Sequence, residues 1–337
     1  MKVGLSYDLK TAISVTQSSA EDALEEYDSL ETVEAIGAAV ESYGHSVVRL
    51  GGGREFLERI LQHDVDVVFN IAEGLGNYRC REAQVPSVLE MLNIPYTGSD
   101  PACLAICLDK PLGKMVVAQQ GVRTPRWHVI ADERELCEAP WDLFPFPAFV
   151  KPAHEGSSMG IRFNSRVEDV GRLVEVATPL LARYQQPVLV EEFIHGDEVT
   201  VGVVGNSPPR VVGIMRVVPR RRERYFIYSL EVKRDWRRLV DYECPARLEA
   251  DIVHEIAESG LRAFEAVGCR DVARIDFRIS HDGVPYFLEI NPLPGLNPAS
   301  GDLPIMASRM GVSYETLIGD ILHSALERYS QCVRQSS

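Results

Sequence analysis

Cysteine is scarce and irregularly placed in this sequence. Only seven of the 337 residues are cysteine, and no two of them form a C-x-x-C pair. Disulfide frameworks and zinc sites are normally signalled by an even number of cysteines or by close pairs, so neither is expected. Scattered thiols are typical of a protein that is kept reduced in the cytoplasm. The seven are Cys80, Cys103, Cys107, Cys137, Cys244, Cys269 and Cys332.

The sequence also lacks the segments that direct a chain to a membrane. It contains no run of about 18 apolar residues, which argues against a membrane-spanning helix. The first ten residues, MKVGLSYDLK, hold no apolar stretch followed by a small-residue cleavage site. We therefore predict a cytoplasmic protein with no membrane partner.

Positive charge is in deficit. The chain has 35 lysines and arginines against 49 aspartates and glutamates, which gives a formal net charge of −14. Such a field repels phosphate backbones, so nucleic acid is not an expected partner. Any anionic ligand must instead be met by local positive groups and by divalent metal.

The first hundred residues predict a small open parallel sheet. Apolar strands are expected at 2–7, 46–50 and 65–71, and helical periodicity covers 29–43 and the region near 54–63. This β-α-β-α-β order favours a parallel sheet. No G-x-G-x-x-G follows the first strand, so a dinucleotide site is not expected.

The rest of the chain, from residue 84 on, mixes strands and helices, so the fold is expected to be α/β with α+β character. The length favours two or three compact units. No internal repeat is present. Strands are expected at 148–151, 187–192, 198–204, 210–217, 272–279 and 284–290, and helices at 84–92, 108–120, 167–183, 246–267 and 313–329.

The segment FVKPAHEGSSMGI (149–161) is the first candidate for chemistry. A lysine at the end of a strand is followed by a stretch rich in glycine and serine. Glycines let the backbone approach a ligand, and N–H and hydroxyl groups can donate to phosphate oxygens. The segment does not match the P-loop pattern G-x-x-x-x-G-K-[ST]. It is therefore either a different phosphate loop or a plain hairpin turn.

The segment RIDFRISHDGVPYFLEINPLPG (274–295) is the second candidate. The Asp282-Gly283 pair predicts a hairpin that brings Asp276 close to Glu289 and Asn291. Three oxygen side chains that converge among apolar neighbours suit Mg²⁺. The alternative is a hairpin whose polar residues face solvent.

The segment PVLVEEFIHGDEVT (187–200) lies between these two. An apolar strand that ends in two acids and a Gly-Asp turn fits an interdomain hinge. Such a hinge can hold a purine ring through backbone groups and one acidic side chain. The alternative is a strand followed by a solvated turn.

In this order, the three segments resemble the ATP-grasp superfamily, and within it the D-alanine–D-alanine ligase family. The resemblance runs from IPYTGSD (94–100) and LDK (108–110) to EINPLPGLNPAS (289–300). It implies an N-terminal parallel-sheet domain at 1–100 and two lobes, 101–191 and 192–337, that clamp ATP. It also implies two Mg²⁺ ions, with Mn²⁺ as an alternative, and a homodimer.

The resemblance further implies roles for individual residues toward the nucleotide. Lys110 and Lys151 match two phosphate-contacting lysines, and Lys233 matches a lysine at the γ-phosphate. Glu191 matches the acceptor for the adenine amino group, and Glu198 matches the ribose ligand. The residues that match the lid, a loop that closes over the nucleotide, are Glu155, Gly156, Ser157 and Ser158. The residues that match the hinge contacts to adenine are Glu192, Phe193 and Ile194.

On the reacting side, the resemblance implies a metal site, an oxyanion site and a substrate site. Asp276, Glu289 and Asn291 match the metal ligands. Arg274 and the Gly295 amide match the oxyanion-stabilising groups. Ser300 matches a serine that contacts the carboxylate of the second amino acid.

These matches imply an ATP-dependent ligase that forms an amide through an acyl phosphate. Its substrates would be a small-molecule carboxylate and an amine, with amino acids expected for both. Two alternatives remain open. One is a relative that phosphorylates or cyclises a carboxylate without a second amine, and the other is a nucleotide-binding module that has lost turnover.

The chain departs from the family pattern on the substrate side. Residues 70–86 lack the family's histidine and its Gly-Glu-Asp-Gly motif, and residues 8–28 look like an insertion. Candidates for contacts to a different substrate are Glu73, Arg81 and Glu82, with a solvated helix start as the alternative. Arg234 follows Lys233 where the family usually has an aromatic residue, and a planar guanidinium suits a carboxylate. We therefore expect Arg234 and its arginine-rich surroundings either to recognise an acidic substrate or to form a solvated loop.

Overall fold

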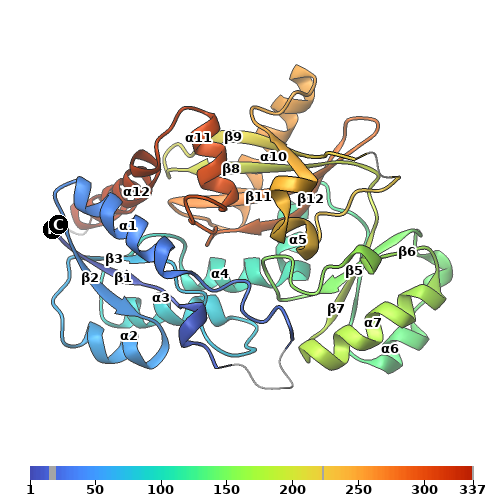
Figure 1. Ribbon diagram of the computed structural model, residues 1–337, viewed down its shortest axis with the longest axis horizontal. Helices are drawn as coiled ribbons and strands as arrows, with labels where there is room; N and C mark the ends of the chain where they lie inside the picture. The colour runs from blue at the N-terminus through green and yellow to red at the C-terminus, as the bar shows by residue number, and fades with distance from the viewer. Residues whose placement is uncertain (15–19, 222–223, 336–337) are drawn as a thin grey trace.

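The computed structural model describes residues 1–14, 20–221 and 224–335 of the chain. These residues form three sheets with helices packed on them, so the predicted α/β class with α+β character is confirmed. Figure 1 shows a parallel sheet at one end of the molecule, an antiparallel sheet at the other and a long antiparallel sheet between them. In the described part of the chain, the helices fall short of the length and apolar character needed to cross a membrane.

The N-terminal sheet is parallel with the order β2-β1-β3, as the β-α-β-α-β pattern predicts. The first of its helices begins where Ser29 Oγ accepts from the Thr32 amide at 3.3 Å, which satisfies one of the free N–H groups of the first turn. The elements are β1 (Lys2–Ser6), α1 (Leu30–Ser42), β2 (Ser46–Gly51), α2 (Gly53–Ile60), β3 (Val67–Asn70) and α3 (Gln84–Met91).

The C-terminal helix α12 (Tyr314–Gln335) returns to this first sheet. It packs on α1, and its apolar side chains share one core with those of the N-terminal strands. Val33 and Ile36 of α1 lie in the same cluster as Leu317 and Ile321 of α12, all four essentially without exposed surface. The two ends of the chain are therefore held together by burial of apolar surface, which contributes about 25 cal/mol per Å².

A four-stranded antiparallel sheet with the order β4-β7-β5-β6 follows in the chain. Its inner strands carry parts of the segments 149–161 and 187–200: β5 contains Lys151, and β7 ends in Glu191 and Glu192. The predicted helix between these strands is present and covers the sheet. The elements are β4 (Trp127–Ile130), α6 (Glu133–Glu138), β5 (Ala148–Pro152), β6 (Arg166–Val167), α7 (Val170–Tyr184) and β7 (Val188–Glu192).

A five-stranded antiparallel sheet with the order β10-β9-β8-β11-β12 completes the fold. The predicted turn at Asp282-Gly283 joins its last two strands, and Gly283 has a φ of 81°, which glycine adopts without a steric penalty. The elements are β8 (Gly196–Val204), β9 (Arg210–Pro219), α8 (Leu230–Arg234), α9 (Trp236–Leu239), β10 (Val240–Glu243), α10 (Ala250–Ala266), β11 (Val272–Ser280), β12 (Pro285–Asn291) and α11 (Asp302–Arg309).

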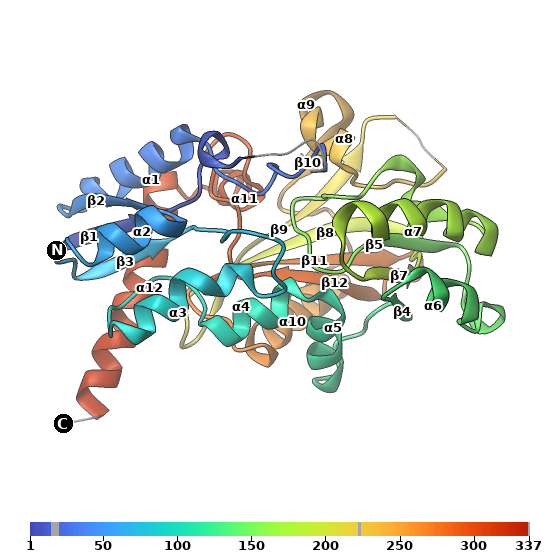
Figure 2. The ribbon, with the colours of Figure 1, turned by 90° about the horizontal axis from the view of Figure 1, so that it is seen from below.

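Two consecutive helices, α4 (Pro101–Leu108) and α5 (Lys110–Gln119), link the first sheet to the second. Both contact β12, and α5 also contacts α10, so they pack on the five-stranded sheet (Figure 2). Asp109 separates them, and its side chain accepts from the Leu112 amide at 3.0 Å, which begins α5 with Lys110 in its first turn. The division at 1–100, 101–191 and 192–337 stays a proposal, with residues 101–119 packed on the last unit.

Candidate active site

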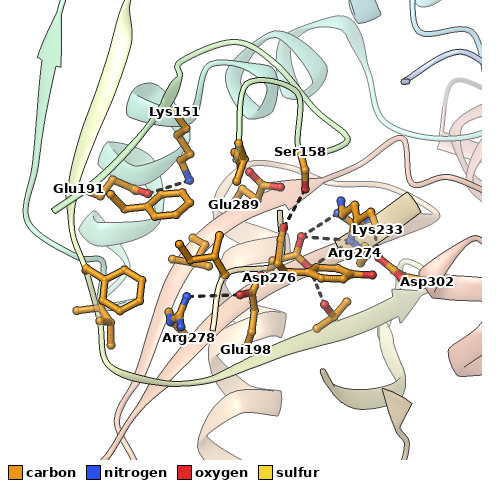
Figure 3. Close-up of a pocket in the computed structure, with 18 of the residues that line it drawn as sticks. Lys151, Ser158, Glu191, Glu198, Lys233, Arg274, Asp276, Arg278, Glu289 and Asp302 are labelled. Carbon is orange, nitrogen blue, oxygen red and sulfur yellow. Dashed lines mark hydrogen bonds and ion pairs between the residues drawn. The ribbon is translucent and has the colours of Figure 1, made fainter. Parts of the chain in front are cut away.

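A cleft runs between the four-stranded and five-stranded sheets. Lys151 and Glu191 line it from one sheet, and Asp276 and Glu289 line it from the other. A chamber of about 370 Å³ adjoins the cleft on the side of the N-terminal domain. Figure 3 shows the residues that line the cleft. The residues common to both spaces are Tyr228, Lys233, Arg274 and Asp302.

A buried group of two lysines and one glutamate forms the floor of the cleft. The Glu191 carboxylate lies 2.8 Å from Lys151 Nζ and 2.5 Å from Lys114 Nζ, and all three side chains are almost fully buried. Burial alone would raise the pKa of Glu191, but the two ammonium groups hold it below its usual value. Burial lowers the pKa of Lys114 to about 8 despite its carboxylate partner. Glu191 therefore fixes both lysines in place.

Lys114 was not singled out from the sequence. It lies one helical turn after Lys110 in α5, so the two side chains lie on the same face of that helix. Its Nζ also donates to the Phe287 carbonyl of β12 at 3.1 Å. The spacing of Lys110 and Lys114 in the sequence could have indicated that both lysines face the same ligand. Either lysine alone is more typical of a solvated surface position.

The predicted hairpin brings the three oxygen side chains together. Asp276 on β11 lies opposite Glu289 on β12, and Asn291 Nδ2 donates to Asp276 Oδ2 at 3.2 Å. Lys110 Nζ lies 3.6 Å from Glu289 Oε2. Burial by itself raises the pKa of Glu289, yet the surrounding cations, Lys110 first among them, lower it to about 2. The Glu289 carboxylate is thus ionised at neutral pH. The set of three side chains offers oxygen ligands, as Mg²⁺ prefers.

Arg274 joins this set to the chamber. Its Nη2 donates to Asp276 Oδ2 at 2.8 Å, and its Nη1 lies 3.5 Å from Asp302 Oδ2 at the start of α11. Burial alone would lower the pKa of Arg274, but Asp276 and Asp302 raise it, so the guanidinium stays charged. Gly295 lines the chamber beside it, as does Ser300, whose Oγ donates to Asn297 Oδ1 at 2.9 Å.

The glycine- and serine-rich loop, residues 153–161, lies over the junction of the cleft and the chamber. Ser157 and Ser158 have φ values of 46° and 59°, a left-handed conformation that is uncommon for residues other than glycine. Ser158 lines the cleft and donates to the Tyr228 carbonyl at 3.2 Å, whereas Ser157 and Gly156 line the chamber. The strained serines indicate that the loop is held in place by its neighbours.

Part of that support comes from the acidic segment 20–28. Glu26 accepts from the Gly156 amide, and Asp22 Oδ2 accepts from the Gly160 amide at 3.0 Å. Tyr184 also donates to Asp22 at 2.7 Å. Carboxylates thus occupy N–H groups of the loop that the sequence analysis assigned to phosphate. From the sequence, residues 8–28 were interpreted only as an insertion. The run of acids in this segment could have indicated contact with a loop rich in hydrogen-bond donors.

Glu155 points away from both spaces. Its carboxylate lies 2.9 Å from Arg81 Nη2 and 2.5 Å from Gln186 Nε2. Arg81 Nη2 also lies 2.6 Å from Glu26 Oε2, and Arg81 Nη1 donates to the His154 carbonyl at 2.9 Å. Only the Glu155 backbone carbonyl faces inward, where it accepts from Lys110 Nζ. Arg81 therefore ties the first domain to the loop, and the Glu155 side chain belongs to that connection.

The far end of the cleft is aromatic and apolar. Phe193 and Ile194 line it together with Glu192 and Glu198. The Arg278 guanidinium lies 4.4 Å from the centre of the Phe193 ring and 3.5 Å from Glu198 Oε2. Arg278 was not predicted as part of the site. Its cation–π contact holds the Phe193 ring as one wall of a flat slot.

Three carboxylates line the chamber from the N-terminal domain. They are Asp28, Glu73 and Glu82, and among the described residues none of the three forms an ion pair. Burial is the main cause of a raised pKa in each case, to about 7 for Asp28 and to about 8 for Glu82. Burial and the neighbouring Glu82 raise the pKa of Glu73 as well. We call these three residues the acidic wall.

Arg234 lies at the rim of the chamber. Its Nε and Nη2 donate to Glu25 Oε1 at 3.0 and 2.5 Å, and about half of its side chain is exposed. Several neighbouring arginines are paired with acids of the chain: Arg216 with Asp197 and Glu243, Arg220 with Asp241, and Arg238 with Asp235.

Lys151 on one sheet thus faces oxygen ligands on another across a cleft, under a glycine- and serine-rich loop, and Lys110 of α5 lies beside these ligands. This combination of fold and site defines an ATP-grasp enzyme. A family model described as "D-ala D-ala ligase C-terminus" matches residues 110–323.

Individual relatives and a solved structure are similar to most of the chain. A D-alanine–D-alanine ligase of Aquifex aeolicus is 33% identical over 300 residues, which cover 87% of this chain and 94% of the relative. A protein of Sinorhizobium fredii named "Uncharacterized protein y4sG" is 33% identical over 305 residues, 88% of each chain. The crystal structure of a D-alanine–D-alanine ligase from Bacillus anthracis with ATP has the same fold, with a TM-score of 0.76, 23% identity and coverage of 98% and 99%.

The chain therefore belongs to the D-alanine–D-alanine ligase family. It is an ATP-dependent ligase that resembles these enzymes.

Proposed function

We propose that this chain joins the carboxylate of an amino acid to the amine of a second small molecule and uses ATP to activate the carboxylate. The observation that carries the proposal is the meeting of the nucleotide cleft and the acid-walled chamber at Lys233 and Arg274. A carboxylate bound at that junction would lie against the groups that contact the γ-phosphate. Family membership supports the reaction type.

ATP would bind along the cleft. Lys110 and Lys151 would contact its phosphates, and Lys233 would meet the γ-phosphate. The slot formed by Glu192, Phe193 and Ile194 would hold adenine, with Glu191 accepting from its amino group and Glu198 meeting the ribose. The loop amides now bound by Glu26 and Asp22 would turn to phosphate once these carboxylates withdraw.

Asp276, Glu289 and Asn291 would hold Mg²⁺, with Mn²⁺ as an alternative. Their donor set fits, because it consists of oxygen atoms from side chains opposite one another on neighbouring strands. Two such ions would neutralise negative charge on the transferring phosphoryl group. Arg274 would have to share Asp276 with the metal, which its second partner, Asp302, makes feasible.

The chamber is polarised in a way that suits an amino acid as the donor. The acidic wall lies on the side of the N-terminal domain, while Lys233 and Arg274 lie on the side of the five-stranded sheet. The ammonium group of the donor would face the wall, and its carboxylate would face the γ-phosphate. Arg274 and the Gly295 amide would then stabilise the oxyanion that forms when the amine attacks. Ser300 would contact the acceptor's carboxylate, and closure by the loop would exclude water.

The pH dependence of donor binding tests the acidic wall. Carboxylates with raised pKa values are protonated at lower pH, so they attract an ammonium group only once they ionise. We expect kcat/KM for the donor amino acid to rise between about pH 6 and 8, in line with the values of about 7 for Asp28 and 8 for Glu82. In Glu82→Gln the rise should shrink, whereas Glu41→Gln, on the exposed face of α1, should behave as wild type. A profile that is flat in the wild type would contradict this role.

The choice of acceptor tests Arg234. Hydrogen bonds to charged groups contribute about 1.5–3 kcal/mol, so losing one from an acidic acceptor should lower kcat/KM about 10- to 150-fold. We expect Arg234→Ala to lower kcat/KM for acidic acceptors by about that factor relative to neutral ones. The matched control is Arg238→Ala, because that side chain is 83% exposed and pairs with Asp235. If Arg234→Ala leaves the preference between acidic and neutral acceptors unchanged, Arg234 has no part in acceptor selection and serves only as the partner of Glu25.

A screen of phosphate release tests the function itself. The purified enzyme would receive ATP, Mg²⁺ and amino acids of both hands, singly and in pairs, with mass spectrometry of the products. A ligase yields ADP, phosphate and an amide in equal amounts. A carboxylate kinase or cyclase would release ADP with a single substrate, and a silent nucleotide-binding module would release no phosphate at all. Sedimentation of the same sample would test the homodimer that the family implies.

A further inference from the structure

Three cysteines that are far apart in the sequence meet in the core beneath the site. Cys103 and Cys107 lie one turn apart on α4, and Cys269 lies in the connection between α10 and β11. The Sγ atom of Cys103 is 3.9 Å from that of Cys107 and 3.6 Å from that of Cys269, and all three side chains are buried. All three sulfur atoms lie within 4.8 Å of one another.

We propose that this cluster binds a soft, thiophilic cation, of which Zn²⁺ and Cu⁺ are the cellular representatives. Metal–thiolate bonds of about 2.3 Å place sulfur ligands about 3.8 Å apart around a tetrahedral ion and about 4.0 Å apart around a trigonal one. The separations of 3.9 and 3.6 Å from Cys103 are close to these values, and the third sulfur pair lies within 4.8 Å, so small side-chain adjustments suffice to enclose an ion. Sulfur ligands select Zn²⁺ and Cu⁺ over Mg²⁺ and Ca²⁺, so the cluster would not compete for the ions of the active site.

The position of Cys103 favours the ionised sulfur that a metal requires. It is the third residue of α4, where hydrogen bonds with the Cys107 and Cys269 thiols and the positive end of the helix dipole favour a thiolate, against the opposing charge of the capping Asp100. Among the described residues, the cluster includes no fourth His, Cys, Asp or Glu ligand. A trigonal ion is therefore bound by protein alone, and a tetrahedral ion keeps one position for a small ligand.

The cluster joins two segments that lead directly into the active site. The chain leaves Cys107 through Leu108 and Asp109 to reach Lys110, and it leaves Cys269 to enter β11, which carries Arg274 and Asp276. A bound ion would clamp α4 to the start of β11. An ion that binds only the folded chain stabilises it by mass action. The alternative is that the three thiols stay reduced and pack as small apolar groups.

The spacing of these cysteines in the sequence does not reveal the cluster. Because Cys269 lies 166 residues from Cys103, no spacing pattern links it to the other two. Cys103 and Cys107 are four residues apart, a spacing that places two metal ligands on the same face of a helix. The spacing therefore indicates a metal site only if the segment is known to be helical.

Metal titration of the full-length protein tests the proposal. The protein would be stripped with a chelator under reducing conditions, then titrated with Zn²⁺ alone and, without oxygen, with Cu⁺ alone. We expect one tightly bound ion per chain by elemental analysis and a higher Tm with at least one of the two metals. The metal that binds identifies the occupant. Failure of both metals to bind would overturn the proposal.

Variants and spectroscopy then locate the ion. Binding should be lost in Cys103→Ala and Cys107→Ala and retained in Cys137→Ala, whose thiol is exposed. Binding that survives Cys103→Ala would overturn the assignment. Because core variants can fail to fold, the wild type should also be titrated with Cd²⁺. A thiolate-to-metal absorption band at one equivalent supports the site, and binding without that band contradicts it.

Discussion

Replacing Arg274 by methionine is expected to lower kcat for amide formation on the order of 10²–10³-fold. The guanidinium lies between Asp276 and Asp302 at the junction of the cleft and the chamber, where the oxyanion would form. Removing one preorganised donor from such a site costs roughly 3–4 kcal/mol in the transition state. The KM for ATP should change much less, because adenine and ribose would bind at the other end of the cleft.

The control for this substitution is Arg247→Met, because that side chain is 87% exposed and lines neither the cleft nor the chamber. It should keep wild-type kcat. Arg274→Met should also raise the Mg²⁺ concentration needed for half-maximal rate only modestly, since the oxygen ligands remain. If the kcat of Arg274→Met is within a factor of about three of the wild-type value, Arg274 does not stabilise the oxyanion.

Replacing Glu191 by leucine is expected to reduce the free energy of unfolding by about 3–5 kcal/mol. The carboxylate is the shared partner of Lys114 and Lys151, and all three side chains are buried. Breaking a buried ion pair by removing one partner leaves uncompensated charge in a region of low dielectric. Denaturant unfolding without ligands measures the effect separately from catalysis.

A second variant separates the loss of charge pairing from a packing defect. Adding Lys114→Met to Glu191→Leu removes one of the two stranded charges, so the double variant should be more stable than Glu191→Leu alone. The neighbouring Glu192→Leu should have a small effect, because Glu192 is only half-buried and forms no ion pair among the described residues. Equal stability of the single and double variants would mean that the lysines are held by other groups.

The parts of the site that the sequence predicted are those set by local geometry. The Asp282-Gly283 turn pairs β11 with β12, and a one-residue shift in that pairing between Asp276 and Phe277 brings Asp276 opposite Glu289. Lys151 and Glu191 likewise lie on neighbouring strands whose ends were visible as apolar runs followed by charge. The N-terminal β-α-β-α-β unit follows from periodicity in the same way. Short-range patterns therefore carried the fold class and the core of the site.

The parts that the sequence did not predict depend on contacts between distant segments. The acidic segment 20–28 contacts the phosphate loop 130 or more residues later, and its run of acids suggests a partner rich in donors without specifying which segment that partner is. Lys114 and Arg278 take their roles from neighbours on other elements. Helix α4 was missed for a different reason: PACLAICL is apolar on all sides, so it has no periodicity that separates a buried helix from a strand.

Transfer of ¹⁸O from a labelled donor carboxylate tests the central claim most directly. If a carboxylate oxygen attacks the γ-phosphorus and the amine then displaces phosphate, that oxygen leaves with the phosphate. With the substrates found in the screen, we predict that each released phosphate carries one ¹⁸O atom and that the amide retains the other. Unlabelled phosphate, formed together with the amide, would contradict activation of the carboxylate by ATP.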